Sequence, residues 1–159
     1  MEIDVTKRIN PIARVVIVKD NHILLTSATK ENDRFDSNLH FLPGGHVEHT
    51  ESAQSAIVRE MSEELYNVNL EVTNFLGVLE CVWDNKGQPY HELNIVFKGE
   101  FDGENIDTPP ISKEPHIKYE WFGLDELKKV NLLPKSFENL IPLWLNANVD
   151  NNLLLATEM

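Results

Sequence analysis

The chain has a single cysteine, Cys81, among its 159 residues. One cysteine excludes an internal disulfide, and its place in an apolar stretch predicts a small core residue rather than a nucleophile. Long apolar runs are also missing, because none approaches the roughly 18 residues that a membrane-spanning helix needs. The first five residues contain no basic segment that leads into an apolar run. We therefore expect a cytoplasmic protein with no membrane partner.

Positive charge is scarce in this sequence. Lys and Arg number 14 against 26 Asp and Glu, which gives a formal net charge of −12. Sequence-independent binding of nucleic acid requires clustered basic residues, and the few present here are dispersed. His91 is expected as a strand residue rather than a metal ligand, since no second histidine lies at a suitable spacing from it. The composition therefore argues against bulk nucleic acid as a partner.

The length allows one compact domain, residues 1–159, to bury a sizeable core without cross-links. Strand-like and helix-like runs follow one another without an internal repeat, which predicts a mixed α/β fold. The expected strands are 14–18, 22–26, 76–79, 93–97 and 117–122, with turns at 19–21 and 84–87. The expected helices are 52–67, 124–130 and 137–145, and the expected polar loops are 30–38 and 104–115.

Three glutamates crowd the end of the first expected helix, where acids are unfavourable. Ser52 is a suitable N-cap, so Glu60, Glu63 and Glu64 fall in the last two turns before Asn67. There the helix dipole disfavours each anion by about 0.3–1 kcal/mol. Stability alone does not require this arrangement.

A projection at 100° per residue places these acids beside the side of the helix that faces the core. The predicted core stripe is Ile57, Met61, Leu65 and Val58, and the neighbouring arc holds Arg59, Glu63, Ala56, Glu60, Ala53 and Glu64. Three nearby carboxylates repel one another unless a cation intervenes, and Mg²⁺ or Mn²⁺ is the simplest one. The alternative is a solvated acidic face with an i,i+4 pair between Arg59 and Glu63.

The spacing upstream favours the metal hypothesis. The sequence resembles the Nudix hydrolase family, whose signature is G-x5-E-x7-R-E-U-x-E-E-x-G-U, with U a bulky apolar residue. The matching positions are Gly45, Glu51, Arg59, Glu60, Met61, Glu63 and Glu64. The last two positions depart from it, because Tyr66 and Asn67 stand in place of glycine and an apolar residue. Asn67 tolerates a positive φ, so we expect the helix to end there and Val68 to take the apolar contact.

The resemblance covers about residues 12–145 and implies an α/β/α sandwich with a mixed β-sheet between helices. It implies hydrolysis of a phosphoanhydride in a nucleoside diphosphate linked to another group, with Mg²⁺ or Mn²⁺ as cofactor. Glu60 and Glu64, with Glu63 and the Gly45 carbonyl, would hold the metal. Glu51 and Arg59 would form a salt bridge that ties the loop to the helix.

The general base and the substrate stay open. Glu63 or Glu64 could take the proton, and so could an acid from a distal loop, for which Glu114 is the candidate ahead of Glu120. A small nucleotide is the expected partner, either of the ADP-ribose or nucleotide-sugar type or a damaged nucleoside triphosphate. A catalytically silent nucleotide-binding regulator is a further alternative, and a homodimer is compatible with the sequence. Trp83, Trp121 and Trp144 are expected in core or rim packing rather than as base-stacking platforms.

Overall fold

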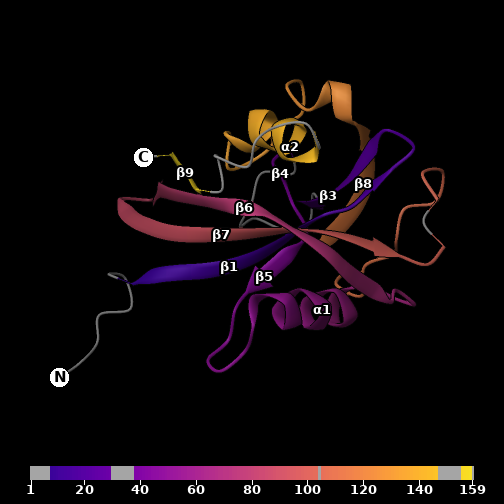
Figure 1. Ribbon diagram of the computed structural model, residues 1–159, viewed down its shortest axis with the longest axis horizontal. Helices are drawn as coiled ribbons and strands as arrows, with labels where there is room; N and C mark the ends of the chain where they lie inside the picture. The colour runs from indigo at the N-terminus through magenta and orange to yellow at the C-terminus, as the bar shows by residue number, and fades with distance from the viewer. Residues whose placement is uncertain (1–7, 30–37, 104, 147–154, 159) are drawn as a thin grey trace.

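The computed structural model of the protein describes residues 8–29, 38–103, 105–146 and 155–158. Two helices enclose two β-sheets (Figure 1). The strands are β1 (Ile9–Val16), β2 (Val18–Lys19), β3 (His22–Ala28), β4 (His40–Phe41), β5 (Gly44–His46), β6 (Leu70–Asn85), β7 (Gln88–Phe101), β8 (Ile117–Gly123) and β9 (Leu155–Glu158). The helices are α1 (Ala53–Glu64) and α2 (Phe137–Leu145), with a 3₁₀ turn, η2 (Leu124–Glu126), after β8.

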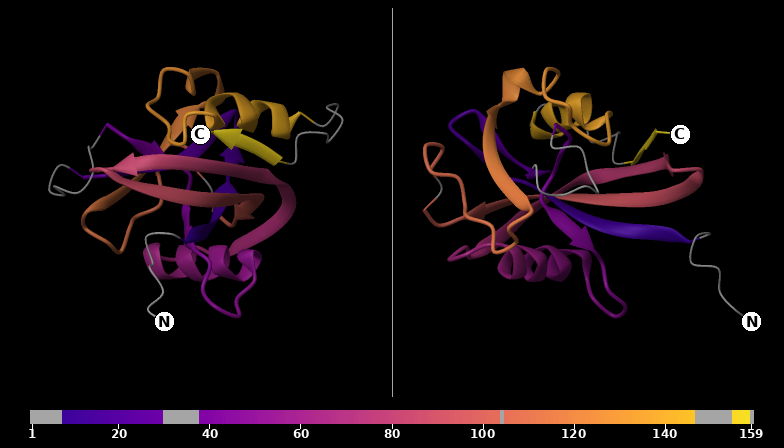
Figure 2. Two further views of the ribbon diagram at one scale, coloured as in Figure 1. Left: turned by 90° about the vertical axis from the view of Figure 1, so that its left-hand side faces the viewer. Right: turned by 180° about the vertical axis from the view of Figure 1, so that it is seen from behind.

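The larger sheet has the strand order β5-β1-β7-β6-β9 and is mixed. The pairs β1–β7 and β6–β9 are parallel, whereas β1–β5 and β6–β7 are antiparallel. In the second sheet β3 pairs with β8 and with the short strands β2 and β4. Figures 1 and 2 show α1 on one side of the larger sheet and α2 on the other. The predicted α/β/α sandwich with a mixed sheet is therefore confirmed.

Each helix covers its own hydrophobic core. The α1 core joins buried residues of the helix to β1 and to Tyr119 of β8, and the α2 core joins Phe137 and Ile141 to Val96 and Leu79. The predicted core stripe of α1 needs one correction. Val58 is 43% exposed and Ala56, predicted on the acidic arc, is fully buried, because the helix presents a narrower apolar stripe than expected.

Most expected elements are present, and the strands are longer than predicted. The turn at Asp20 and Asn21 is confirmed, since both residues adopt the positive φ of a two-residue hairpin. The expected helix at 124–130 is wrong, because only η2 and a turn form there. His40 pairs with the backbone of Asn131 and Leu133, which requires an extended chain directly after the turn.

Two further expectations concern segments without regular structure. The predicted loop at 30–38 lies, except for Asn38, outside the described residues. Residues 105–115 are irregular, as expected, apart from one bridge between Leu65 and Ser112. Strand β9 was not predicted from the sequence. In the part of the chain that the structure describes, none of the helices has the length and apolarity to cross a membrane.

Candidate active site

Helix α1 positions the acidic motif, and its two ends show how. Ser52 is the N-cap, and its Oγ accepts a hydrogen bond from the Ser55 backbone N at 3.1 Å. The helix ends at Glu64, three residues before the predicted Asn67, because Leu65 adopts an extended conformation and is buried. Asn67 has a φ of 55° and supplies the left-handed turn that a glycine would otherwise make. Val68 then packs against the α1 core, as expected.

Arg59 connects the helix to the loop that precedes it. Its Nε and Nη2 donate to the two carboxylate oxygens of Glu51 at 2.8 and 3.1 Å, and Nη2 also donates to the His46 carbonyl at 3.1 Å. Nη1 donates to Glu60 at 3.1 Å and to Glu63 at 3.3 Å. This is the ion pair that the resemblance implies, and Arg59 lowers the pKa of Glu51 by donating to its carboxylate.

The carboxylate of Glu60 lies directly against Gly45. A Cβ atom at position 45 would overlap this carboxylate, with Glu60 Oε2 only 2.7 Å away. Gly45 is held in β5 opposite Ala13, so the loop backbone cannot move aside without breaking the strand pair. The glycine therefore allows the close approach of an acidic side chain to the backbone.

Glu64 points toward the second sheet, where the Tyr119 hydroxyl donates a hydrogen bond to its Oε2. Tyr119 lies on β8 and is 4% exposed. Burial raises the pKa of Glu64, and the nearby Glu60 carboxylate raises it further. Glu64 is thus a half-buried carboxylate oriented by a buried phenol.

A cation lies beside this pair of carboxylates. Arg14, on β1, donates from Nη1 to the Leu42 carbonyl at 2.9 Å and from Nε to Asn94 at 3.4 Å. Burial lowers its pKa, while its electrostatic neighbours, which include Glu64 and Glu60, oppose that effect. Arg14 is therefore held on the larger sheet by the Leu42 carbonyl and Asn94, while the charges of Glu60 and Glu64 act on it.

The other predicted acids lie farther from this centre. Glu63 is 58% exposed and pairs with Arg59. Glu114 is half exposed in the loop that packs on the end of α1, and its charge acts on Glu64. Glu120 is on the side of β8 opposite to Tyr119 and pairs with Lys118 at 3.0 Å, so the structure does not bring it to the site.

The donor set suits a hard divalent cation. Glu60, Glu64 and the Gly45 region offer oxygen ligands that repel one another without a cation. The acidic side chains are held by Arg59 and Tyr119, and no group of three acidic, histidine or cysteine side chains among the described residues is already arranged around a metal position. Binding of a metal would therefore require small rotations of these carboxylates.

Two residues of this site were not predicted from the sequence. Arg14 opens an otherwise apolar run, Arg14–Val18, and Tyr119 alternates with polar residues in the β8 segment. A charge within an apolar strand-like run is a signal that could have identified Arg14. The role of Tyr119 depends on the pairing of distant segments, which periodicity does not reveal.

Comparison with known proteins identifies the family. The model of the NUDIX domain matches residues 9–143. The ADP-ribose pyrophosphatase of Methanocaldococcus jannaschii is 33% identical over 72% of this chain and 62% of its own length. An 8-oxo-dGTP diphosphatase of Buchnera aphidicola subsp. Schizaphis graminum is 31% identical, over 73% of this chain and 78% of its own. An NAD-capped RNA hydrolase, NudC of Pseudomonas putida, is 31% identical over 76% of this chain, which spans only 38% of that relative.

Solved structures agree on the fold. The MutT protein of Methanosarcina mazei Go1 superposes with a TM-score of 0.66 at 20% identity, covering 89% of this chain and 96% of the other. The NUDIX domain model matches most of the chain, and two of the relatives named above are more than 30% identical to it over about 70% of its length. The chain belongs to the NUDIX domain family, as the resemblance predicted.

Proposed function

We propose that this protein is a divalent-metal-dependent pyrophosphohydrolase of nucleoside diphosphates linked to another group, of the ADP-ribose or nucleotide-sugar type. The observation that carries the proposal is the arrangement of Glu60 against Gly45 and of Glu64 against Tyr119 at one end of α1. A binding-only protein has no need of this repulsive pair. The pyrophosphatase and diphosphatase names of the relatives support hydrolysis of a phosphoanhydride.

The proposed roles follow from the contacts. Glu60 and Glu64, with Glu63 and the Gly45 carbonyl, would hold Mg²⁺ or Mn²⁺. The ion, when bound, neutralises phosphoryl oxygens and lowers the pKa of a water ligand. Arg59 holds the loop carbonyl of His46 and the Glu51 carboxylate, so that the loop and the helix keep one geometry. Tyr119 orients Glu64 from the second sheet.

The residue that takes the proton from the attacking water is Glu63, Glu64 or Glu114. Glu63 is exposed and paired with Arg59, whereas Glu114 lies in the neighbouring loop with half of its side chain in solvent. The variants Glu63→Gln and Glu114→Gln separate these roles, because a general base contributes about 10²- to 10⁴-fold to the rate. A loss of that size in Glu114→Gln identifies Glu114 as the base. A loss in Glu63→Gln identifies Glu63 only if it persists at saturating Mg²⁺, because Glu63 is also a proposed metal ligand.

A second substrate class has its own support. The Buchnera relative is named an 8-oxo-dGTP diphosphatase, and this chain covers more of its length than of the ADP-ribose pyrophosphatase. Clearance of damaged nucleoside triphosphates is therefore the alternative activity.

One panel of substrates tests the function. ADP-ribose, nucleotide sugars, dinucleoside polyphosphates and normal or oxidised nucleoside triphosphates are compared by kcat/KM with Mg²⁺ and with Mn²⁺. We expect the highest kcat/KM for ADP-ribose or a nucleotide sugar. Exclusive turnover of triphosphates refutes this substrate preference, and tight nucleotide binding without hydrolysis of any compound favours a regulator.

A further inference from the structure

The last turn of α1 carries the proposed metal ligand Glu64 at the end of the helix that favours cations. The last four carbonyls of an α-helix have no donor inside the helix. The Met61 carbonyl accepts from the backbone N of Leu65 at 3.0 Å, and the last turn contains no basic residue of its own. The remaining carbonyls, and the acids beside them, therefore need donors and positive charge from another part of the chain.

Lys113 supplies both. Its backbone N donates to the Glu64 carbonyl at 2.6 Å, and its Nζ donates to the Ser62 carbonyl at 2.7 Å. A lysine ammonium at the carboxyl end of a helix also opposes the negative end of the helix dipole. Lys113 lies in the loop before β8, and Figure 2 shows this loop beside one end of α1. One residue of a distant segment thus satisfies two carbonyls of the acidic turn.

The backbone around Lys113 is paired with the chain that leaves α1. Leu65 forms an antiparallel bridge with Ser112, and the Tyr66 backbone N donates to the Ile111 carbonyl at 3.2 Å. Lys113 Nζ also lies 5.7 Å from the centroid of the Tyr66 ring, which is a weaker contact than its hydrogen bond to the helix. Lys113 therefore bonds the loop to the helix through its backbone and through its side chain.

The segment 111–119 holds Glu64 at two points. The backbone N of Lys113 bonds the Glu64 carbonyl, and the hydroxyl of Tyr119 bonds the Glu64 carboxylate. Glu114, the distal candidate for the general base, follows Lys113 directly, and its charge acts on Glu64. A loop that moved away from the helix would therefore displace Glu114 and release the backbone of Glu64.

We propose that Lys113 is a positioning residue of the metal site. It holds the acidic turn of α1 against the segment 111–119, so that Glu64 and Glu114 keep one geometry relative to each other. Its Nζ is engaged by the Ser62 carbonyl, so it acts through the helix and not by contact with the substrate. This inference rests on the proposed function and adds a residue outside the signature that supports the metal site.

The test compares two substitutions of this lysine. Lys113→Met keeps the length of the side chain but removes its charge and donors, whereas Lys113→Arg keeps both. Lys118→Met is the matched control, because Lys118 is an exposed lysine of the same segment that pairs with Glu120. Mn²⁺ affinity is measured by electron paramagnetic resonance without substrate, and hydrogen exchange of the metal-free protein follows the amides of Tyr66 and Lys113. Thermal unfolding verifies that each variant is folded.

We expect Lys113→Met to weaken Mn²⁺ binding by about 10-fold, the lower end of the range for residues that support metal ligands, because its backbone bond to Glu64 remains. The amides of Tyr66 and of residue 113 should exchange faster. Lys113→Arg and Lys118→Met should match the wild type in both measurements.

Two results would overturn the proposal. One is a lower unfolding temperature of Lys113→Met with unchanged Mn²⁺ affinity of the folded protein, since the lysine would then be structural only. The other is a loss of Mn²⁺ affinity in Lys113→Arg as large as in Lys113→Met, since charge and donors would then not position the site.

Kinetics of the best substrate in the panel add a third readout. Lys113→Met should need more Mg²⁺ for its half-maximal rate, while its substrate KM at saturating Mg²⁺ stays that of the wild type. A raised substrate KM with unchanged Mn²⁺ affinity would show that Lys113 contacts the substrate and would overturn the positioning role.

The same measurements separate this inference from the proposed function. If the wild type hydrolyses a substrate and Lys113→Met binds Mn²⁺ equally well, the positioning role is wrong and the hydrolase stands. If the wild type hydrolyses no compound of the panel but its Mn²⁺ binding depends on Lys113, the positioning role stands and the hydrolase is wrong.

Discussion

At the scale of single residues, Glu64 combines burial with a phenol partner and a nearby like charge. We predict that Glu64→Gln lowers Mg²⁺-dependent turnover by about 10²- to 10⁴-fold. Without metal, the variant should be as stable as the wild type or more so, because a half-buried charge is removed. Activity assays and thermal unfolding measure the two effects.

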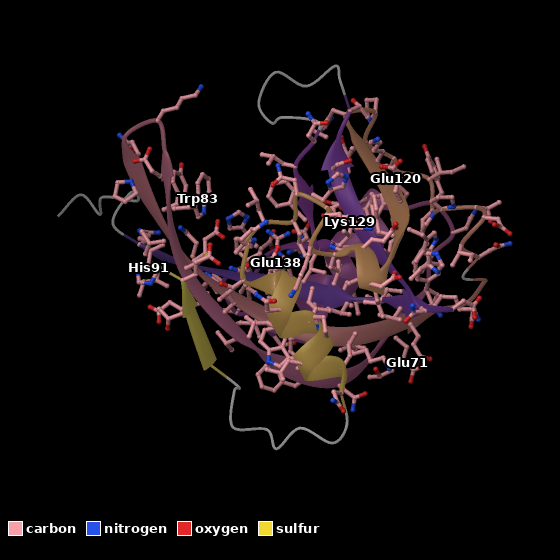
Figure 3. The ribbon with its side chains drawn as sticks, turned by 90° about the horizontal axis from the view of Figure 1, so that it is seen from above. Glu71, Trp83, His91, Glu120, Lys129 and Glu138 are labelled. Carbon is pink, nitrogen blue, oxygen red and sulfur yellow. The ribbon has the colours of Figure 1, made fainter. Side chains whose placement is uncertain are left out.

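The control for this variant is Glu71→Gln, which changes an exposed glutamate at the start of β6 (Figure 3). It should keep full activity and an unchanged metal requirement. Full activity of Glu64→Gln with an unaltered Mg²⁺ dependence would show that Glu64 is not part of the metal site.

Gly45 is a second position where the addition of one atom is expected to change the metal site. In Gly45→Ala the added Cβ overlaps the Glu60 carboxylate, which must then move. We predict that Mn²⁺ affinity, measured by electron paramagnetic resonance, falls about 10- to 100-fold, the scale found when the support of a metal ligand is changed.

Gly103→Ala serves as the comparison for backbone effects. Gly103 has a φ of 78° and open space around its Cα. This variant should lose about 1 kcal/mol or more of stability through strain, with unchanged Mn²⁺ affinity. Equal Mn²⁺ affinity in Gly45→Ala and the wild type would remove Glu60 from the site.

The residue scale also shows what the sequence could and could not predict. The ion pair of Glu51 with Arg59 was expected, because the resemblance to the family implies a salt bridge between these two positions. The contact of Tyr119 with Glu64 was not, because 55 residues separate them and only the packing of β8 beside α1 joins them. The catalytic roles of all these residues stay predictions.

At the scale of elements, the end of α1 departs most from the family signature. Tyr66 is 55% exposed, and its backbone N donates to the Ile111 carbonyl at 3.2 Å. We predict that Tyr66→Gly lowers the free energy of unfolding by less than about 2 kcal/mol, through backbone entropy and loss of the Lys113 contact. The metal requirement should not change, because Asn67 already makes the turn.

Chemical denaturation and Mn²⁺ titration of Tyr66→Gly measure these two quantities. A large loss of metal affinity would mean that Tyr66 supports the site. Tyr66→Phe, which keeps the ring and its contact with Lys113, should match the wild type in both measurements.

Elements differed in how well the sequence predicted them. Helix α2 has the predicted bounds, Phe137–Leu145. The periodicity of a short apolar run depends only on residues that are close in sequence, so it can be recognised without the rest of the fold. The strands β6 and β7 extend well beyond the apolar runs at 76–79 and 93–97, because their polar outer ends are held by pairing with each other rather than by burial. The segment at 124–130 has helical periodicity but forms only η2 and a turn, because the chain directly after it is extended and Leu132 bridges with His40.

At the scale of the whole molecule, the charge of −12 limits the partners. We predict that a duplex DNA or a single-stranded RNA of about 20 nucleotides binds more weakly than about 10⁻⁴ M near physiological salt. The reason is that polyanions need clustered cations, whereas Arg14 and Arg59 are both engaged by carboxylates or carbonyls. Fluorescence anisotropy at two salt concentrations measures the affinity, and micromolar binding that weakens steeply with salt would contradict the prediction.

The β6–β7 hairpin has one face against the α1 core and the other toward α2, with neighbouring residues alternating between them. Side chains such as Ile95 and Phe97 belong to the core under the helix that carries the acids, while Glu92 and Tyr90 lie on the other face of the same strand. A substitution at one position of β7 therefore changes one face of the sheet, and a substitution at the next position changes the other. Alternate codons of this single strand thus specify two different surfaces of the molecule, one under each helix.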